Sequence, residues 1–303
     1  MPGSVTLRPV EERDLERAAD VNFVAFYHVA LAHGLPPTVT TPAESREYLR
    51  FLLAADPLGG VVAEEDGALV GVGWVHRRGP IATVGPLVVD PRAQGRGIGR
   101  QLLARCIEAA GAGVLQVRLV QDSVNTVSLG LYLRAGFRVV ASLLECELRG
   151  GLARAAAVPG GGLVIRAASD ADRARIVARD GRAFGAERPQ AVDVYLQQGR
   201  ALVAERAAAV AAYALGIGAG PTAFLGSASA DDADVLLALI ARLADELLGS
   251  ADAVRLLVPS ADRRLVDGLI QLGFRLFRAC HYMVRGGGTA PPSNYVLMNG
   301  DMM

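Results

Sequence analysis

Residues 85–100 read Gly-Pro-Leu-Val-Val-Asp-Pro-Arg-Ala-Gln-Gly-Arg-Gly-Ile-Gly-Arg, and they decide how the first half of this 303-residue chain folds. The apolar run over residues 81–89 predicts a buried β-strand. Asp90 and Pro91 end that strand, and three glycines then lead into an amphipathic pattern that predicts a helix over residues 99–110. A strand, a glycine-rich loop and a helix therefore follow one another directly.

The loop between this strand and this helix has the features of an anion site. The N-terminus of a helix exposes unpaired N–H groups and a partial positive charge. Glycine lets such a backbone approach phosphate oxygens without a Cβ in the way, and Arg96 and Arg100 can add charge-assisted hydrogen bonds. The loop therefore indicates a ligand that carries phosphate.

Spacing excludes two common phosphate-binding loops. A dinucleotide-binding loop needs Gly-x-Gly-x-x-Gly after the first strand of its domain, but here Arg100 takes the place of the third glycine and the loop follows the fourth predicted strand. A P-loop needs Gly-Lys-Ser/Thr, and the chain contains no lysine.

The rest of the first half alternates between strand and helix patterns. Strands are predicted over residues 5–8, 61–65, 68–76, 81–89, 114–120 and 137–148. Helices are predicted over residues 11–31, 45–53, 99–110 and 126–135. This order predicts an α/β fold. Its sheet is expected to be mixed, with parallel and antiparallel strands, as in α+β proteins.

The second half begins the pattern again. Arg166 and Asp172 repeat the spacing of Arg8 and Asp14. The short sequence around residue 255 resembles that around residue 118, and the sequence ending at residue 274 resembles that ending at residue 137. Both matches are separated by 137 positions. We expect a duplicated unit. The predicted domains are a catalytic domain over residues 1–149, a Gly- and Ala-rich linker over residues 150–162, and a second domain of the same fold over residues 163–303.

Two segments of the first half carry a family resemblance. Residues 94–99, Gln-Gly-Arg-Gly-Ile-Gly, match the pattern Gln/Arg-x-x-Gly-x-Gly/Ala. Residues 125–137 match Asn-x-x-Ala/Ser-x-x-Leu-Tyr-x-x-x-Gly-Phe. Both resemble signatures of the GNAT superfamily of N-acetyltransferases. The resemblance implies two tandem GNAT-like acyl-CoA N-acyltransferase domains and an enzyme that uses acetyl-CoA as its acetyl donor.

The resemblance also implies a set of site residues. The backbone of residues 87–89 would pair with the pantetheine arm of the cofactor, and the glycine loop would hold the pyrophosphate. The implied cofactor-binding residues are Leu87, Val88, Val89, Gln94, Gly95, Arg96, Gly97, Ile98, Gly99, Arg100, Asn125 and Ser128. Tyr132 would act as the general acid, because a phenol has a reference pKa of about 10 and can protonate a departing thiolate.

The general base stays open at this point. Candidates along the chain are Glu64, Glu65, His76 and Asp122, or an ordered water. His28 and His33 fall in the helical region that shapes the acceptor pocket in the family.

The second half lacks both signatures when it is aligned at the 137-residue separation. Asp231, Asp234 and Leu236 stand at the positions of Gln94, Gly97 and Gly99, and Asp262, Leu265 and Leu269 at those of Asn125, Ser128 and Tyr132. Aspartates repel a pyrophosphate, and leucines offer neither space nor a proton. We therefore expect a degenerate GNAT-like domain without a cofactor site.

Composition excludes some classes of binding partner and indicates a cellular compartment. Acidic and basic residues balance at 31 each, which argues against nucleic acid and membrane surfaces as partners. Three scattered cysteines predict neither a disulfide framework nor a metal site. The first residues do not resemble a signal peptide, and no apolar run is long enough to span a bilayer, so we expect a cytoplasmic protein. A homodimer is left open.

The function predicted from the sequence is transfer of acetyl from acetyl-CoA to a primary amine by direct attack. The amine would belong to a small molecule or a peptide, and the sequence does not choose between them. Two alternatives remain: a non-catalytic acyl-CoA binding or sensor protein, and an acyltransferase that uses a longer acyl-CoA.

Overall fold

The computed structural model describes residues 4–154, 160, 162–207 and 209–298. The chain divides into two compact units. The first comprises Met1–Arg138 and Met283–Gly288, and the second comprises Val139–Tyr282 and Thr289–Met303.

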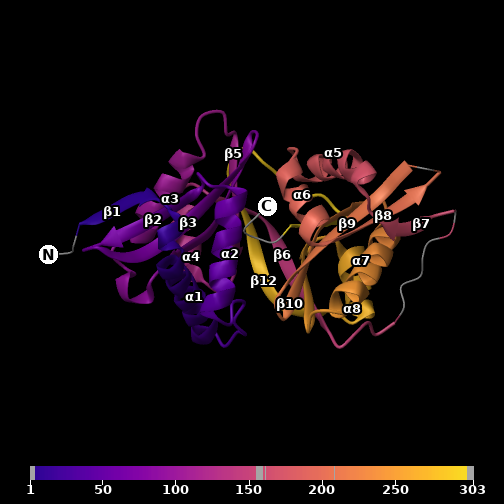
Figure 1. Cartoon of the computed structure of the whole chain (residues 1–303), viewed down its shortest axis with the longest axis horizontal. Helices are drawn as coiled ribbons and strands as arrows, with labels where there is room; N and C mark the ends of the chain where they lie inside the picture. The colour runs from indigo at the N-terminus through magenta and orange to yellow at the C-terminus, as the bar shows by residue number, and fades with distance from the viewer. Residues whose placement is uncertain (1–3, 155–159, 161, 208, 299–303) are drawn as a thin grey trace. The chain divides into compact units, whose positions relative to one another are not determined.

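The first unit follows the predicted order of elements (Figure 1). Its strands are β1 (Val5–Pro9), β2 (Gly60–Glu65), β3 (Ala68–Arg78), β4 (Ile81–Val89) and β5 (Gln116–Asp122). Its helices are α1 (Leu15–Ala32), which follows a short 3₁₀ turn (Glu12–Asp14), α2 (Pro42–Ala55), α3 (Ile98–Ala109) and α4 (Thr126–Arg134), with a second 3₁₀ turn (Pro91–Ala93) before α3.

Local sequence explains these boundaries. Thr41 caps α2, since its hydroxyl accepts a hydrogen bond from the Glu44 N–H, and Pro42 stands at the first helical position. Asp66 and Gly67 both have positive φ, which is the backbone that a tight two-residue hairpin turn requires between β2 and β3. The predicted hairpin is thereby confirmed.

The sheet of the first unit is mixed, as predicted. Strands β1 to β4 lie in chain order and pair antiparallel, and β5 then pairs with β4 in the parallel direction. Helix α3 packs on one face, where Ile98 and Leu102 join a buried cluster with Val61 and Ala63 of β2. Val62 points to the other face and is also fully buried, which places a second layer there, and α1 packs against β3 and β4.

The second unit repeats this architecture. Its strands are β6 (Arg138–Arg149), β7 (Val164–Ala167), β8 (Arg200–Arg206), β9 (Ala209–Ala219), β10 (Thr222–Ala230), β11 (Ala253–Pro259), the larger part of β12 (Arg275–Gly286) and β13 (Tyr295–Val296). Its helices are α5 (Arg173–Phe184), α6 (Pro189–Gln198), α7 (Ala233–Leu248) and α8 (Arg263–Leu272), with a 3₁₀ turn (Asp170–Asp172) before α5. Helix α7 packs against β8, β9 and β10 and contributes to a buried apolar cluster of the unit.

The compact units differ from the predicted domains at two strands. The sequence places a boundary at residue 149, so that β6 would complete the first domain. In the structure β6 belongs to the second unit, where it pairs antiparallel with β11 over seven residue pairs from Ala253↔Arg149 to Pro259↔Leu143. The end of β12, from Met283 onward, belongs to the first unit. Strand exchange of this kind depends on contacts far apart in sequence, which local patterns do not report.

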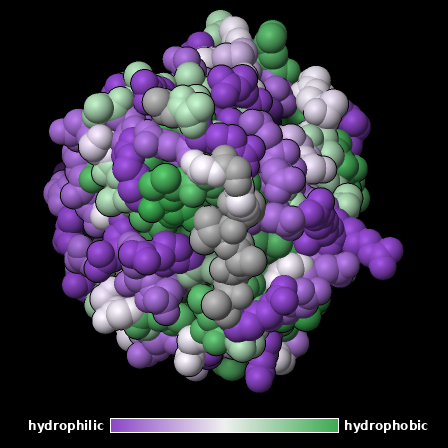
Figure 2. Space-filling model, turned by 90° about the vertical axis from the view of Figure 1, so that its right-hand side faces the viewer, coloured by the Kyte–Doolittle hydropathy of each residue, from purple (hydrophilic) through white to green (hydrophobic). Residues whose placement is uncertain are grey.

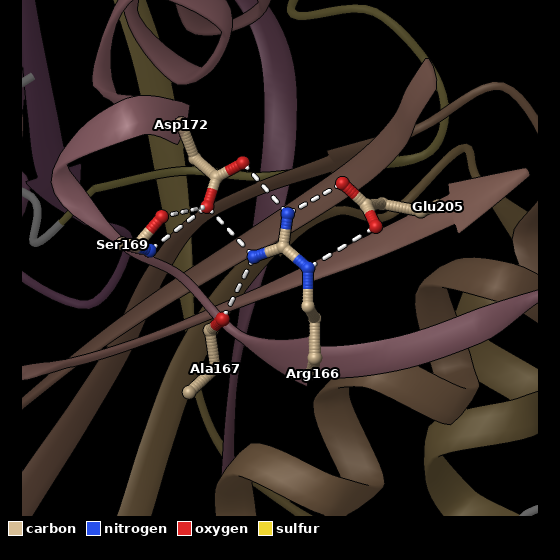
Figure 3. Close-up of polar contacts among 5 residues, drawn as sticks. All are labelled: Arg166, Ala167, Ser169, Asp172 and Glu205. Carbon is tan, nitrogen blue, oxygen red and sulfur yellow. Dashed lines mark hydrogen bonds and ion pairs between the residues drawn. The ribbon is translucent and has the colours of Figure 1, made fainter. Parts of the chain in front are cut away.

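Each unit contains the same ion cluster. In the first, the Arg8 guanidinium contacts the Asp14 and Glu64 carboxylates at 2.6 Å each. In the second, Arg166 Nη1 lies 2.7 Å from Asp172 Oδ2, and Arg166 Nε lies 3.1 Å from Glu205 Oε2 (Figure 3). The predicted correspondence of these arginine–aspartate pairs is therefore a repeated contact as well as a repeated spacing.

The face of the molecule drawn in Figure 2 is mostly hydrophilic. The broadest group of apolar side chains in that view lies left of its centre, and smaller groups lie at its upper right and lower edge. The large apolar side chains that the described part of the second unit exposes are Val139, Val164, Ile270 and Leu276. Within the described residues, no helix combines the length and the apolar character needed to cross a bilayer.

The Arg166 cluster gives a first test. Asp172→Asn removes a charged acceptor from Arg166 and from the Ser169 N–H and hydroxyl, so we expect the free energy of unfolding to fall by about 2 kcal/mol in urea titrations. Hydrogen bonds from Arg166 lower the pKa of Asp172 in the folded state. The difference from wild type should therefore be full above about pH 4 and shrink as the pH falls further.

Asp170→Asn is the matched control, because Asp170 is an exposed carboxylate in the same turn. Equal losses in the two variants would contradict a specific role for the cluster.

Candidate functional site

The central feature of the first unit is a parallel strand pair that separates. β4 and β5 pair at three positions, Ile81↔Gln116, Ala82↔Val117 and Thr83↔Arg118. Beyond Thr83, the described residues of the two strands have no further register with each other. The β5-facing backbone groups of residues 84–89 therefore have no strand partner there, whereas β3 still pairs with the other edge of β4 up to Val89.

The glycine loop lies at the end of the separated part of β4. Gly95 and Gly97 have φ values of 78° and 83°, which favour glycine, and a Cβ at Gly95 would meet nothing within 4 Å. Gly97 is the N-cap of α3 and supplies no side-chain acceptor to the first turn. The N–H groups of that turn consequently remain available to an anion.

Side chains tie the loop to β4 and to β2. Gln94 Nε2 donates to the carbonyl oxygen of Val89 at 3.0 Å. Arg96 Nη1 donates to Glu65 Oε2 at 2.9 Å. Ile98 is buried in the core, so its backbone alone can face a ligand, while Arg100 is exposed and its Nη2 lies 3.7 Å from where a Cβ of Gly97 would be.

The second signature starts α4 at the end of β5. Asn125 caps the helix, since its side-chain oxygen accepts from the Ser128 N–H at 3.1 Å, and the Ser128 hydroxyl donates to the Asn125 carbonyl oxygen at 3.0 Å. Tyr132 is 8% exposed, one turn after Ser128, and its ring meets that of Phe137 edge to face at 5.9 Å between centroids. The expected spacing is therefore present, and the Tyr132 ring belongs to the core.

Gln121 is a residue of this region that the sequence analysis missed. Its Nε2 donates to the Asn125 carbonyl oxygen at 2.8 Å and to the Ser128 hydroxyl at 3.2 Å. It therefore fixes the start of α4 from the end of strand β5. The sequence signal that could have indicated Gln121 is its position beside Asp122, where the strand ends and the loop before α4 begins.

The candidate bases have different surroundings. Glu64 is held in the Arg8 cluster and Glu65 is paired with Arg96. Asp122 ends β5, and its carbonyl oxygen accepts from the Asn125 N–H. His28 and His33 are exposed on and just after α1.

His76 lies between two acceptors. Its Nδ1 is 2.6 Å from Asp56 Oδ2, and its Nε2 is 3.1 Å from the carbonyl oxygen of Gly85. Both ring nitrogens are therefore engaged, one by a carboxylate oxygen and one by a backbone carbonyl oxygen. His76 is also fully buried, so its geometry fits a link between α2 and β4 better than a base.

Asp56 anchors this link. Arg78 donates to both carboxylate oxygens of Asp56, at 2.7 and 2.8 Å. Burial by itself would raise the pKa of the Asp56 carboxyl, but the hydrogen bonds from Arg78 and His76 outweigh burial and lower that pKa to about 2. The carboxylate thus stays charged at neutral pH and ties the end of α2 to β3.

The equivalent region of the second unit is built differently. Eight residues, 90–97, separate β4 from α3, but only two, 231 and 232, separate β10 from α7. The constant separation of 137 therefore fails here, and the capping position of Gly97 corresponds to Asp232, not to Asp234. Asp232 accepts hydrogen bonds from the Asp234 and Val235 N–H groups, which occupies the first turn of α7.

Comparison with known proteins agrees with this geometry. Residues 27–137 match the family model described as Acetyltransferase (GNAT) family, and residues 176–297 match one described as Acetyltransferase (GNAT) domain. The chain belongs to the GNAT superfamily, with two GNAT domains in tandem.

Relatives of this tandem GNAT protein include two curated acetyltransferases. One, named mycothiol acetyltransferase, from Propionibacterium freudenreichii subsp. shermanii, is 32% identical over 47% of this chain and 46% of its own length. The other, named N-alpha-acetyltransferase RimI, from Mycobacterium tuberculosis, is 38% identical over 26% of this chain and 52% of its own length. The chain thus spans about half the length of these relatives.

The GNAT fold extends over nearly the whole chain. A crystal structure of a GCN5-related N-acetyltransferase from Sphaerobacter thermophilus superposes with a TM-score of 0.67 at 17% identity, covering 96% of this chain and 98% of that one. The described residues contain no cluster of three or more His, Cys, Asp or Glu side chains that could hold a metal ion.

The Asp56 link can be tested through the single tryptophan of the chain. Trp74 is fully buried and donates to the Asp56 carbonyl oxygen at 3.1 Å, so its fluorescence reports on the first unit. We expect Asp56→Asn to lower the free energy of unfolding by about 2 kcal/mol in urea, because Arg78 and His76 lose a charged acceptor. The stabilisation by the native carboxylate should be full above about pH 4 and disappear towards about pH 2.

The exposed Asp20→Asn on α1 serves as the control for this measurement and should leave the transition in place. An Asp56→Asn protein that unfolds at the wild-type urea concentration would refute the link.

Proposed function

We propose that the first GNAT unit transfers an acetyl group from acetyl-CoA to a primary amine by direct attack. The observation that carries this proposal is the separation of β4 from β5 beyond Thr83, next to the uncapped start of α3. Separated strands leave backbone donors and acceptors that an extended arm can pair with, and the helix start suits a pyrophosphate. The two features adjoin each other through residues 87–97.

The residues of this region fit such a cofactor. The backbone of Leu87, Val88 and Val89 would pair with the pantetheine arm. The N–H groups from Gly95 to Arg100 would hold the pyrophosphate, where the positive φ of Gly95 and Gly97 turns the backbone without a Cβ. Arg96 would have to share its charge between the phosphate and Glu65, its present partner at 2.9 Å.

The reaction requires two proton movements. The amine nitrogen forms a bond to the thioester carbonyl carbon, the carbon–sulfur bond breaks, and the sulfur leaves with the electron pair of that bond. We assign to Tyr132 the donation of a proton to this sulfur. The proton lost by the amine goes to a base, for which Glu64, Glu65, His76, Asp122 or an ordered water stay open. Of these residues, Glu64, Glu65 and His76 would have to act from within their present contacts.

The comparisons support acetyl transfer without choosing an acceptor. One relative is named mycothiol acetyltransferase and the other N-alpha-acetyltransferase, and the proposed acceptor is a small-molecule or peptide amine. A binding or sensor protein would bind acetyl-CoA without turnover on any amine. An acyltransferase for longer chains would prefer a longer acyl-CoA in the same assay.

Calorimetry tests cofactor binding. We expect acetyl-CoA to bind the wild-type protein with a stoichiometry of one per chain, and Gly97→Asp to abolish binding, because a carboxylate would then face the pyrophosphate. Gly79→Asp is the matched control, since Gly79 also has a positive φ, meets nothing within 4 Å and lies in the turn at the opposite end of β4. If acetyl-CoA does not bind the wild-type protein, the proposal is refuted.

Tyr132→Phe tests the general acid. We expect kcat with a primary amine to fall about a hundredfold or more, while the acetyl-CoA dissociation constant changes little. Tyr195→Phe is the control, because it removes a phenol that is also buried, from the second unit. A rise in the dissociation constant at unchanged kcat would assign Tyr132 to binding instead.

A further inference from the structure

The second unit contains the same separated strand pair as the first. β10 and β11 run parallel and pair at Thr222↔Ala253, Ala223↔Val254 and Phe224↔Arg255, after which their registers with each other end. A later segment of the chain, residues 294–298, lies between them; we refer to it as the insert segment. Its Val296 and Tyr295 pair antiparallel with Ala228 and Ser229 of β10, and its Leu297 bridges to Leu257 of β11.

The insert segment is packed as a core strand. Tyr295, Val296, Leu297 and Met298 are each exposed by 3% or less. The Leu297 N–H donates to the Leu257 carbonyl oxygen at 2.8 Å. Its backbone also lies directly against β10, because a Cβ built on Gly226 would fall 2.1 Å from the Leu297 carbonyl oxygen.

Asp262 binds the insert segment from the start of α8. It caps α8 through Oδ1, which accepts from the Leu265 N–H at 3.2 Å, as Asn125 caps α4. Its second oxygen, Oδ2, accepts from the Asn294 N–H at 2.5 Å. The position that carries Asn125 in the first unit thus serves a peptide backbone in the second.

A buried polar network holds Tyr295. Arg188 is fully buried and donates to Asp180 Oδ2 at 2.7 Å and to the Tyr295 hydroxyl at 2.8 Å. Tyr213 and Ser227 each donate to Asp180 Oδ1 at 2.6 Å. The network therefore neutralises its charges internally and presents one directed donor to the Tyr295 side chain.

We propose that the separated strands of the second unit form a peptide-binding groove, whose ligand is the extended insert segment of the same chain. The segment takes the place that an acyl-CoA arm would need, pairs with both strands and completes the core of the unit. The two-residue connection before α7, with its first turn capped by Asp232, offers no cradle for a pyrophosphate. This inference is independent of catalysis in the first unit.

Hydrogen exchange of the full chain, followed by mass spectrometry, tests the groove. In the wild-type protein we expect the amides of residues 295–298 to exchange as slowly as those of β10 and β11, with and without acetyl-CoA. Exchange at the rate of an unstructured peptide would overturn the inference. Loss of protection on addition of acetyl-CoA, together with binding of two acetyl-CoA molecules per chain, would also overturn the inference, because the cofactor would then displace the segment.

Gly226→Ala tests the packing of the segment against β10. The new methyl group would collide with the Leu297 carbonyl oxygen, so we expect at least a tenfold faster exchange at residues 295–298. Gly218→Ala on β9 is the control, because a Cβ there meets nothing within 4 Å. Unchanged protection in Gly226→Ala would contradict the proposed groove.

A milder variant covers the case in which Gly226→Ala does not fold. Tyr295→Phe removes only the hydroxyl that accepts from Arg188, so faster exchange confined to the insert segment is expected, and unchanged exchange there would count against the network. In every variant acetyl-CoA should still bind once per chain. Failure of the wild-type protein to bind acetyl-CoA, with residues 295–298 still protected, would refute the proposed function and leave this inference intact.

Discussion

A parallel strand pair that stops pairing after three residues imposes one requirement on each unit. Backbone N–H and C=O groups beyond the third pair have lost their partner strand, and buried groups of this kind need another one. In the second unit the insert segment supplies it, through β13 on one side and Leu297 on the other. In the first unit the corresponding edge of residues 84–89 is where we propose that an acyl-CoA arm pairs. The chain itself thus meets this requirement in the second unit, and we propose that a ligand meets it in the first.

The start of the following helix shows the same divergence. Gly97 begins α3 without a side-chain acceptor, and eight loop residues with two positive-φ glycines bring the chain to that point. Asp232 begins α7 after two residues and uses its carboxylate to satisfy the first turn. A helix start can bind an anion only while its N–H groups are available. Capping by an acid therefore stabilises the helix and removes the phosphate site in one step.

Structural contacts outside the site have been retained in both copies. The clusters of Arg8 and Arg166 join an aspartate of the first 3₁₀ turn to a glutamate of the next strand. Their arginine–aspartate spacing was visible in sequence because it is local. Their glutamates were not matched, because the intervening helices differ in length between the halves. The same limit explains the misplaced alignment of the loop, since a constant separation of 137 cannot represent a shortened connection.

The sequence by itself determined the local elements, the duplication and the family. Periodicity, glycines, caps and two short signatures report on neighbouring residues, and these predicted α3, α4 and the strand between them to within a few residues. Tertiary structure alone decided to which units β6 and the end of β12 belong. It also decided that His76 bridges Asp56 and Gly85, and that residues 294–298 lie between the separated strands of the second unit. The reason is physical: these features arise from pairing between segments distant in the chain, and such pairing is selected by which backbone groups and buried charges remain to be satisfied once the local elements have formed.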